Sequence, residues 1–326
     1  MNLLGRIKPD WYLIFIIGAG ALASFVPARG EAAVWLSWLT KIAIAVVFFL
    51  HGARLSREAV IRGVVHWRLH LMILAATFAL FPALTVGMTL LPPWITPPEL
   101  AAGLILLGCL PSTIQSSIAF VGIARGNVPA AVASASASNL IGVFLTPLLA
   151  GLLMHAEGAI SPGSFWAIVV QLLVPFVLGQ VARPWVGDVV ARHSKQLGLL
   201  DRGTIVLIVY VAFSSAVVAG VWNTLGALDL LRLVVLCCVL LAVVLAVTAF
   251  AARALGFSKE DEIAIVFCGS KKSLASGAPI AAALLTPAVA GVAMIPLMIF
   301  HQLQLMVCAA LAQRYARRPD MDTESG

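Results

Sequence analysis

Long runs of apolar residues, separated by short polar segments, make up most of the chain. The runs are continuous, as in residues 233–251, and do not alternate with polar positions. A helix needs ~20 apolar residues to cross the hydrocarbon core of a bilayer, whereas the strands of a transmembrane barrel alternate over ~10 residues. The pattern therefore predicts an all-α polytopic membrane protein with ten transmembrane helices. We expect these spans at residues 11–26, 34–52, 68–91, 99–124, 128–154, 164–183, 203–222, 230–252, 261–285 and 288–312.

The composition excludes a soluble globule. Hydrophobic residues make up 61% of the chain and charged residues 11%, against ~45–50% and ~25% in soluble domains, and the mean hydropathy is +1.04. A net charge of +7 would suggest nucleic acid as a partner of a soluble protein, but here most basic residues lie at the ends of apolar runs. The partner that this composition predicts is the lipid bilayer, with no nucleic acid.

The distribution of Lys and Arg predicts the topology. Sixteen of the 21 lie in the two terminal segments and in every second loop, whereas only Arg29 and Arg232 lie in the other loops. Cytoplasmic loops carry such an excess, so we expect both termini in the cytoplasm and the chain in a bacterial inner membrane. Residues 21–23 weakly match a signal-peptidase site, which leaves a cleaved signal as the alternative. A retained first span fits the even number of spans better.

Ten spans divide into two halves of five, residues 1–158 and 159–326. Because five is odd, the second half enters the membrane with opposite orientation, and inverted repeats of this kind are typical of secondary transporters. Each half has a polar stretch part-way along one span, at residues 109–117 in the fourth and 268–273 in the ninth. These corresponding interruptions predict a substrate or ion site near the bilayer midplane.

Pro111 removes a backbone donor and clashes with the preceding turn, so the fourth span should break there. The candidate site residues at the two interruptions are Ser112, Thr113, Gln115, Ser116 and Ser117 in the fourth span, and Ser270 and Ser273 in the ninth. Their side chains can satisfy freed backbone groups or hold a ligand. A half-helix that begins at either break would point its positive end towards an anion. The alternative is that these residues only patch kinked helices or serve helix packing.

Lys271 and Lys272 are the residues that most strongly indicate a functional site in this sequence. A charge at this depth costs at least ~2.5–3.5 kcal/mol on insertion scales, and helical neighbours lie ~100° apart, so at least one should face the protein interior. The alternative is that the pair snorkels to an interface. All fourteen acidic residues lie in loops, tails or span ends. Because a midplane sodium site usually needs a carboxylate, the two lysines favour an anionic substrate.

Two further spans carry candidate residues at depth. The tenth contains His301 and Gln302, and a lone membrane histidine more often serves packing than proton relay. The fifth contains Ser134, Ser138 and Asn139, of which the two serines share a helix face at i, i+4. Residues this small permit close helix packing as readily as they bind a ligand, and both interpretations stay open.

Three motifs carry a resemblance to a known family. They are Ala-Arg-Gly-Asn-Val at 124–128, Leu-Thr-Pro at 145–147 and Cys-Gly-Ser-Lys-Lys-Ser-Leu-Ala-Ser-Gly at 268–277. Over nearly its whole length the chain resembles the bile acid:sodium symporter superfamily, in the branch of the seventh-member type and its bacterial homologues. The resemblance implies two inverted repeats in which helices 4 and 9 are broken and cross. It also implies a core domain of spans 3–5 and 8–10, a panel domain of spans 1, 2, 6 and 7, and substrate binding between them.

The chain departs from this family at the positions that the resemblance assigns to sodium. Symporting members place a glutamate in span 9 where this chain has Phe267, and a Gln-Asn pair where it has Lys271 and Lys272. Their span 3 glutamine corresponds to Thr77, which joins the candidate residues. We therefore hypothesise that a lysine ammonium occupies the space that sodium fills in these relatives. A lysine buried in protein can release its proton near neutral pH, which makes proton coupling physically reasonable.

The sequence thus predicts a secondary-active transporter of a small organic anion that works by alternating access. Its coupling would be to protons, by exchange, or absent. One alternative is a sodium-coupled organic anion symporter, and another is a non-transporting membrane regulator or a membrane enzyme. The spans lack paired acids, His-metal spacing and a nucleophile-base pattern, and the chain lacks a P-loop. We therefore expect no enzyme activity, no metal and no cofactor.

Overall fold

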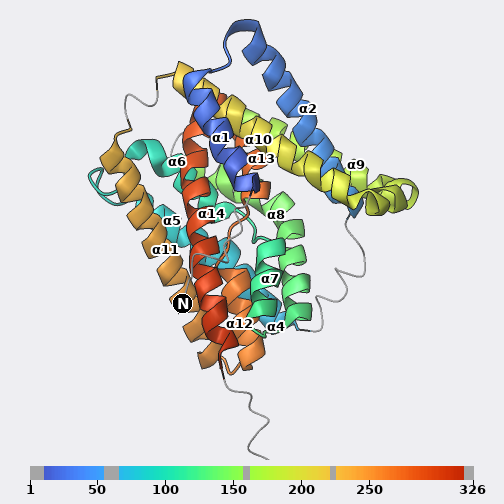
Figure 1. Cartoon of the computed structure of the whole chain (residues 1–326), viewed down its shortest axis with the longest axis vertical. Helices are drawn as coiled ribbons and strands as arrows, with labels where there is room; N and C mark the ends of the chain where they lie inside the picture. The colour runs from blue at the N-terminus through green and yellow to red at the C-terminus, as the bar shows by residue number, and fades with distance from the viewer. Residues whose placement is uncertain (1–10, 55–65, 157–161, 221–224, 319–326) are drawn as a thin grey trace, which may run out of the picture. The chain divides into compact units, whose positions relative to one another are not determined.

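The computed structural model describes residues 11–54, 66–156, 162–220 and 225–318 (Figure 1). All regular structure in these ranges is helical. Six helical stretches there are long and apolar enough to cross a bilayer. They are α2 (Gly30–Arg54), the stretch Trp67–Thr89, α8 (Val128–Ala156), α10 (Ser194–Val218), α11 (Ala227–Ala254) and α14 (Pro287–Ala316). The prediction of an all-α polytopic membrane protein is therefore confirmed.

One predicted loop is helical in the structure. The basic segment 183–202 was expected to be a connection, but α9 (Pro162–Arg192) continues to Arg192 and α10 begins at Ser194. The reason is amphipathicity, because Val186 and Val190 lie four residues apart and pack with Leu50 and Ala53 of α2. A hydropathy pattern detects a uniformly apolar span, but it does not detect an extension that is apolar on one face only.

The chain divides into two compact units, and the first comprises residues 1–54, 160–226 and 278–294. Within it α1 (Trp11–Phe25) packs along α10, and α2 packs along α9 (Figure 1). The contact between α2 and α9 is backbone against backbone. A Cβ atom at Gly52 would meet the carbonyl group of Phe176, and one at Gly179 would meet that of Phe49. Glycine is therefore required on both helices for this close approach.

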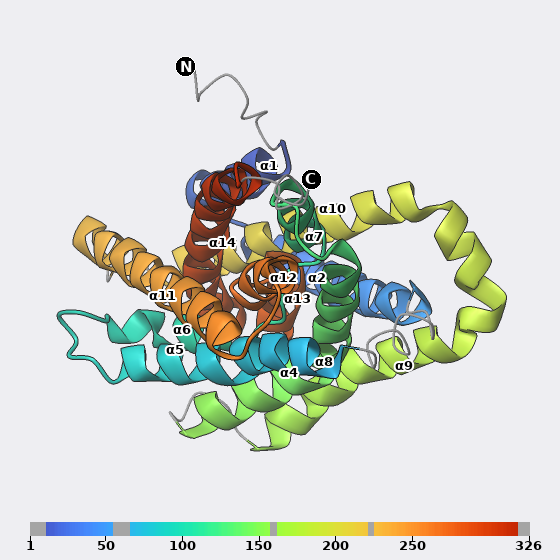
Figure 2. The ribbon, with the colours of Figure 1, turned by 90° about the horizontal axis from the view of Figure 1, so that it is seen from below.

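The second unit comprises residues 55–159, 227–277 and 295–326. Besides α8, α11 and most of α14, it contains α4 (Trp67–Ala75), the π-helical turn Ala76–Leu80, α5 (Phe81–Thr89), the short turn Pro98–Leu100, α6 (Ala101–Cys109), α7 (Gln115–Ile123), α12 (Lys259–Gly269) and the start of α13 (Leu274–Leu284). Figure 2 shows α12 with α4, α7, α8 and α11 around it, and its residues from Glu262 to Gly269 are buried. The short helix α12 is therefore the core element of this unit.

Two helical pairs in this unit are interrupted. α6 ends at Cys109 and α7 begins at Gln115, whereas α12 ends at Gly269 and α13 begins at Leu274. These are the two places where polar residues interrupt the fourth and ninth predicted spans. At the first one Leu110 is extended (φ −69°, ψ 151°), and the following Pro111 has no amide hydrogen to continue the helix. Each interruption leaves the carbonyl oxygens of a helix end without helical donors.

Candidate functional site

The two interruptions contact each other directly. The amide of Ser273 donates to the carbonyl oxygen of Pro111 at 2.9 Å. The hydroxyl of Ser112 donates to the carbonyl oxygen of Cys268 at 2.6 Å, and that of Ser117 to the carbonyl oxygen of Phe267 at 3.3 Å. Hydroxyl groups of the first interruption thus supply donors to the last carbonyls of α12. Five of these six residues belong to the two polar stretches, and their side chains or backbones join the segments.

The ammonium group of Lys272 lies where the two interruptions contact each other, a place that is called the crossing from here on. Its Nζ donates to the carbonyl oxygens of Thr77, Gly108 and Leu110, each at 2.7 Å. The side chain is 1% exposed, and the ring of Phe81 lies 4.2 Å from Nζ. An ammonium has three donors, so all of them are used. Thr77, predicted as a side-chain ligand, takes part through its backbone, because its hydroxyl donates to Ile73 at 2.8 Å.

The three carbonyl oxygens are available for local reasons. Residues 76–80 form a π-turn in which the amide of Phe81 bonds to Ala76, five residues back. The next residue in that register is Pro82, which has no amide hydrogen for Thr77. Gly108 and Leu110 lie at the end of α6, where carbonyls have no helical donor. Lys272 therefore supplies the donors that Pro82 and the end of α6 remove.

The backbone of Lys272 is held by a residue that the sequence reasoning missed. Gln304 on α14 accepts from the Lys272 amide at 2.8 Å and donates to the Lys272 carbonyl at 2.8 Å. Nδ1 of the predicted His301 contacts the side-chain nitrogen Nε2 of Gln304 at 3.0 Å. His301 and Gln304 share a helix face at i, i+3, and this spacing was the available signal. The predicted Gln302 points elsewhere, and its Oε1 is buried without a partner among the described residues.

Lys271 occupies a different environment from its neighbour. Its Nζ donates to the carbonyl oxygen of Ser116 at 2.8 Å and lies 4.0 Å from the ring centre of Phe120. The ring of Phe267 is 5.5 Å away. The residue is fully buried. An aromatic pair therefore surrounds this ammonium, and the electron-rich ring faces partly replace the water that it has lost.

Helix α8 contributes to the crossing through Ser138 and Asn139. Ser138 accepts from the amide of Ser112 at 3.1 Å, and Asn139 donates to the carbonyl of Ser112 at 2.7 Å. Asn139 also accepts from the hydroxyl of Ser276 at 3.1 Å. Ser134 does not join this group. It lies one turn earlier and contacts Nδ1 of His70 at 2.6 Å, a buried partner that the sequence analysis did not propose.

The remaining predicted residues have separate roles. Thr113 contacts the hydroxyl of Ser116 at 2.7 Å, beside the start of α7. Ser273 caps α13, since its hydroxyl accepts from the amide of Ser276 at 3.1 Å. Ser270 is fully buried, whereas Gln115 is exposed and stands apart from the crossing contacts.

The electrostatics of the site are cationic. In the part of the chain that the structure describes, both ammonium groups meet carbonyl oxygens and aromatic rings, and neither pairs with a carboxylate. Nor do these residues include a group of three or more His, Cys, Asp or Glu side chains that could hold a metal ion. The site can therefore brace two crossing half-helices or attract an anion, but it has no carboxylate of its own for a sodium ion.

The fold and site define a polytopic membrane protein whose two interrupted helical pairs contact each other at a buried lysine. The chain belongs to the SBF-like CPA transporter family, whose sequence profile matches residues 10–317. This confirms the resemblance to the bile acid:sodium symporter type that the motifs indicated. The protein is accordingly a transporter, and not an enzyme.

Similar proteins cover almost the whole chain. An uncharacterized protein of Pseudomonas aeruginosa is 54% identical over 320 residues, with 97% of this chain and 95% of the relative covered. The protein named Putative symporter YfeH of Escherichia coli K12 is 53% identical over 312 residues, covering 95% and 94%. Sodium/bile acid cotransporter 7 of Mus musculus is 28% identical over 331 residues, covering 95% and 94%.

Proposed function

We propose that the chain is a secondary-active carrier of a small organic anion, working by alternating access, in which the Lys272 ammonium replaces a bound sodium ion. The observation that carries this proposal is the set of three carbonyl oxygens, each 2.7 Å from Nζ of a residue that is 1% exposed. Hard cations such as sodium prefer oxygen ligands of this kind. A position already filled by a tethered cation has no room for a free one.

An anionic substrate fits the charge at the site. Lys271 and Lys272 bring two buried ammonium groups without carboxylate partners among the described residues. The half-helices α7 and α13 both begin at the crossing, where their positive ends favour negative charge. The exposed Gln115 and the half-buried Ser116 at the start of α7 are candidate substrate contacts. The name of the mouse relative supports a coupled carrier of a bile-acid-like anion, and the name of the E. coli relative supports a symporter.

The finer architecture belongs to the same proposal. We propose ten transmembrane helices in two inverted repeats, residues 1–158 and 159–326. The core domain would consist of spans 3–5 and 8–10, and the panel domain of spans 1, 2, 6 and 7. The two compact units support this division, since each draws on both halves of the chain. A bacterial inner membrane with both termini in the cytoplasm is supported by the Lys and Arg distribution.

The coupling of transport has two candidates. With Lys272 in place of sodium, transport would be coupled to protons, proceed by exchange, or be uncoupled. The second candidate is sodium-coupled symport, which the printed name of the mouse relative favours. For that mechanism, sodium would need a site away from Lys272. The hydroxyl oxygens of Ser138 and Ser276 and the side-chain oxygen of Asn139 would be candidate ligands for it at the crossing.

Thermal unfolding of the detergent-purified protein separates these two candidates. Na⁺ is titrated against K⁺ or choline at matched ionic strength, for the wild type and for Lys271→Gln and Lys272→Asn. Ligand that binds the folded state raises stability by RT ln(1 + [L]/Kd), about 2.7 kcal/mol at 100-fold Kd. We expect no Na⁺-specific shift in the wild type. Such a shift would establish a sodium site and make sodium symport the leading mechanism.

Uptake in proteoliposomes tests the carrier itself. Candidate organic anions are offered under an imposed pH gradient, with vesicles lacking the protein as the control. We expect uptake that continues when Na⁺ is replaced by choline. Binding of the anion without uptake would contradict the carrier and favour a membrane regulator.

A further inference from the structure

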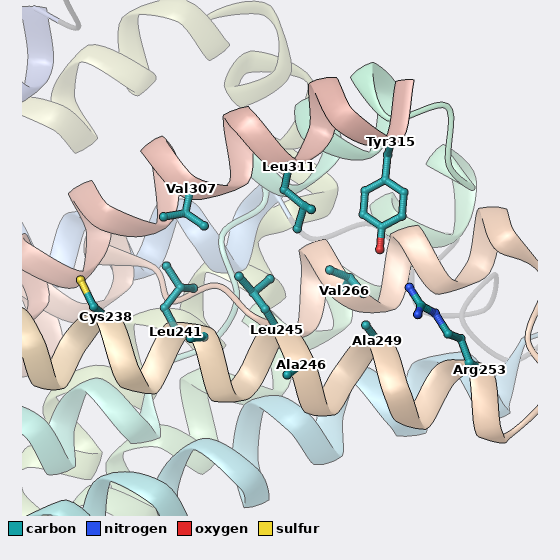
Figure 3. Close-up of a pocket in the computed structure, with 11 residues that line it drawn as sticks. Cys238, Leu241, Leu245, Ala246, Ala249, Arg253, Val266, Val307, Leu311 and Tyr315 are labelled. Carbon is teal, nitrogen blue, oxygen red and sulfur yellow. The ribbon is translucent and has the colours of Figure 1, made fainter. Parts of the chain in front are cut away.

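A groove of about 450 Å³ lies on the second unit (Figure 3). Its lining comes from one face each of α11 and α14, together with Val266 of α12. The lining residues are Cys238, Leu241, Ala242, Leu245, Ala246, Ala249, Arg253, Val266, Val307, Leu311 and Tyr315. The α11 members recur every three to four residues, so they form one continuous stripe on that helix. Small alanine side chains in the stripe leave the space that the groove occupies.

The polarity of the groove changes from one end to the other. Arg253 and Tyr315 face each other at one end, and the rest of the lining is apolar up to Cys238 at the other end (Figure 3). From Cys238 to Ala249 the stripe runs about 16 Å along the helix. Half of the hydrocarbon core of a bilayer is about 15 Å thick. The apolar part of the groove therefore matches the depth of one leaflet.

The polar end carries an excess of positive charge. Glu262 is 3% exposed and accepts from Arg253 at 2.9 Å, from Lys259 at 2.8 Å and from Tyr315 at 3.0 Å. Two cations thus share one carboxylate. Arg253 uses only Nη2 in this pair, and its side chain is 61% exposed. The guanidinium has further N–H donors, and such donors suit a phosphate group.

The side of α11 next to the groove presents apolar groups to the bilayer. Val239 is 48% exposed and Phe250 is 75% exposed. A molecule from the surrounding lipid can therefore reach the groove without crossing water. Basic pockets between transmembrane helices are known to accept anionic lipid headgroups.

We propose that this groove binds one anionic phospholipid, with an acyl chain along the α11 stripe and the phosphate at Arg253. The charge of the polar end selects an anionic headgroup, and the apolar length matches a single leaflet. Under the topology proposed above, the lipid comes from the cytoplasmic leaflet, which carries the anionic surface charge. This site is independent of the transported anion and of the coupling ion.

Native mass spectrometry of the delipidated protein tests the proposal, with phosphatidylglycerol and phosphatidylcholine as probes. We expect the wild type to retain one phosphatidylglycerol more tightly than phosphatidylcholine. Arg253→Gln should weaken phosphatidylglycerol binding by about tenfold, which is the loss expected for a charge-assisted contact. Arg232→Gln is the matched control, since Arg232 lies at the other end of α11 and pairs with Asp229 at 2.9 Å.

A second variant covers the case in which Arg253→Gln does not fold. Ala246→Phe fills the groove without touching the ion cluster and should also lower phosphatidylglycerol retention. Equal retention of the two lipids by the wild type would overturn the proposal. Undiminished phosphatidylglycerol binding in Ala246→Phe would overturn it as well, because the lipid would then lie elsewhere on the protein surface.

Discussion

The amide of Ser273 donates to the carbonyl oxygen of Pro111 at 2.9 Å, which joins two segments that lie in different halves of the sequence. Neither segment is helical at this point, so each leaves backbone groups that water would satisfy in a soluble protein. Inside a membrane protein those groups must find protein partners. The contact therefore belongs to a set of hydrogen bonds in which each interruption supplies partners for the backbone groups of the other. Lys272 contributes the most of these bonds, three from its ammonium group.

Replacing Lys272 should destabilise the second unit strongly. Lys272→Met keeps an unbranched apolar stem but removes the ammonium, and leaves the carbonyls of Thr77, Gly108 and Leu110 without their donor. A buried acceptor left unpaired costs about 1–3 kcal/mol, so we expect a loss of about 3 kcal/mol or more. Thermal unfolding in detergent measures it as a fall in the apparent melting temperature.

Lys41→Met is the matched control for this substitution. Lys41 is exposed and contacts the ring of Trp38, with Nζ 4.9 Å from the ring centre. Removing it should change stability by less than about 1 kcal/mol. If Lys272→Met were as mild as Lys41→Met, the three carbonyl contacts would contribute little, and the bracing role proposed for Lys272 would be wrong.

Gly108 should not tolerate a side chain. A Cβ atom there would meet the hydroxyl of Thr85 and lie 3.2 Å from the carbonyl oxygen of Phe81, which would push α6 away from α5. We expect Gly108→Ala to cost about 1–3 kcal/mol through overpacking. Gly87→Ala on α5 is the control, because nothing lies within 4 Å of its Cβ position. The control should be neutral or stabilise by about 0.4–1 kcal/mol, and an equal loss in both variants would contradict the packing argument.

The contact between α2 and α9 gives a parallel prediction for the first unit. Gly52→Ala would place a methyl group against the Phe176 carbonyl, which belongs to the backbone and cannot rotate away. The cost should therefore reach the upper part of the overpacking range, about 3 kcal/mol. Gly18→Ala on α1, where the Cβ position has open space, serves as the control. A shift in the melting temperature for both variants alike would count against the close approach.

The proposed topology predicts where the C-terminus lies. Arg318 donates to Glu260 at 2.7 Å and to the carbonyl of Arg125 at 2.7 Å, so three basic or acidic segments meet at one end of the second unit. That end should face the cytoplasm, where basic residues accumulate. A green fluorescent protein fused after residue 326 should fluoresce, and an alkaline phosphatase fusion at the same position should be inactive. The reverse pattern would invert the topology.

The six long apolar helical stretches could be predicted from the sequence, because a bilayer imposes a length of apolar chain that a pattern reveals directly. The interruption at Pro111 was also predictable, since proline removes a donor whatever surrounds it. The different partners of Lys271 and Lys272 were not. They depend on the π-turn at residues 76–80 and on how α6 ends beside it, which are tertiary facts. Two adjacent lysines look alike in a sequence.

The same limit explains the missed glutamine. His301 and Gln302 were predicted because they are polar residues at depth in the tenth span, but neighbouring side chains lie ~100° apart on a helix. Gln304 shares the face of His301 and holds both backbone groups of Lys272. The inverted repeats and the residues that contact substrate stay predictions, because they concern arrangement and binding and not local chain geometry.

A cation that is part of the chain cannot diffuse away. A free ion dissociates from its ligands. The fraction of sites that it occupies depends on its concentration in the compartment that the site faces. The ammonium of Lys272 is attached by four methylene groups to the backbone that it stabilises, so its local concentration is fixed by geometry. Dilution, dialysis or a change of bathing salt therefore leaves the three carbonyl oxygens occupied. If the proposed function holds, this position has no vacant state for a free sodium ion to fill, and a sodium gradient performs no work through it.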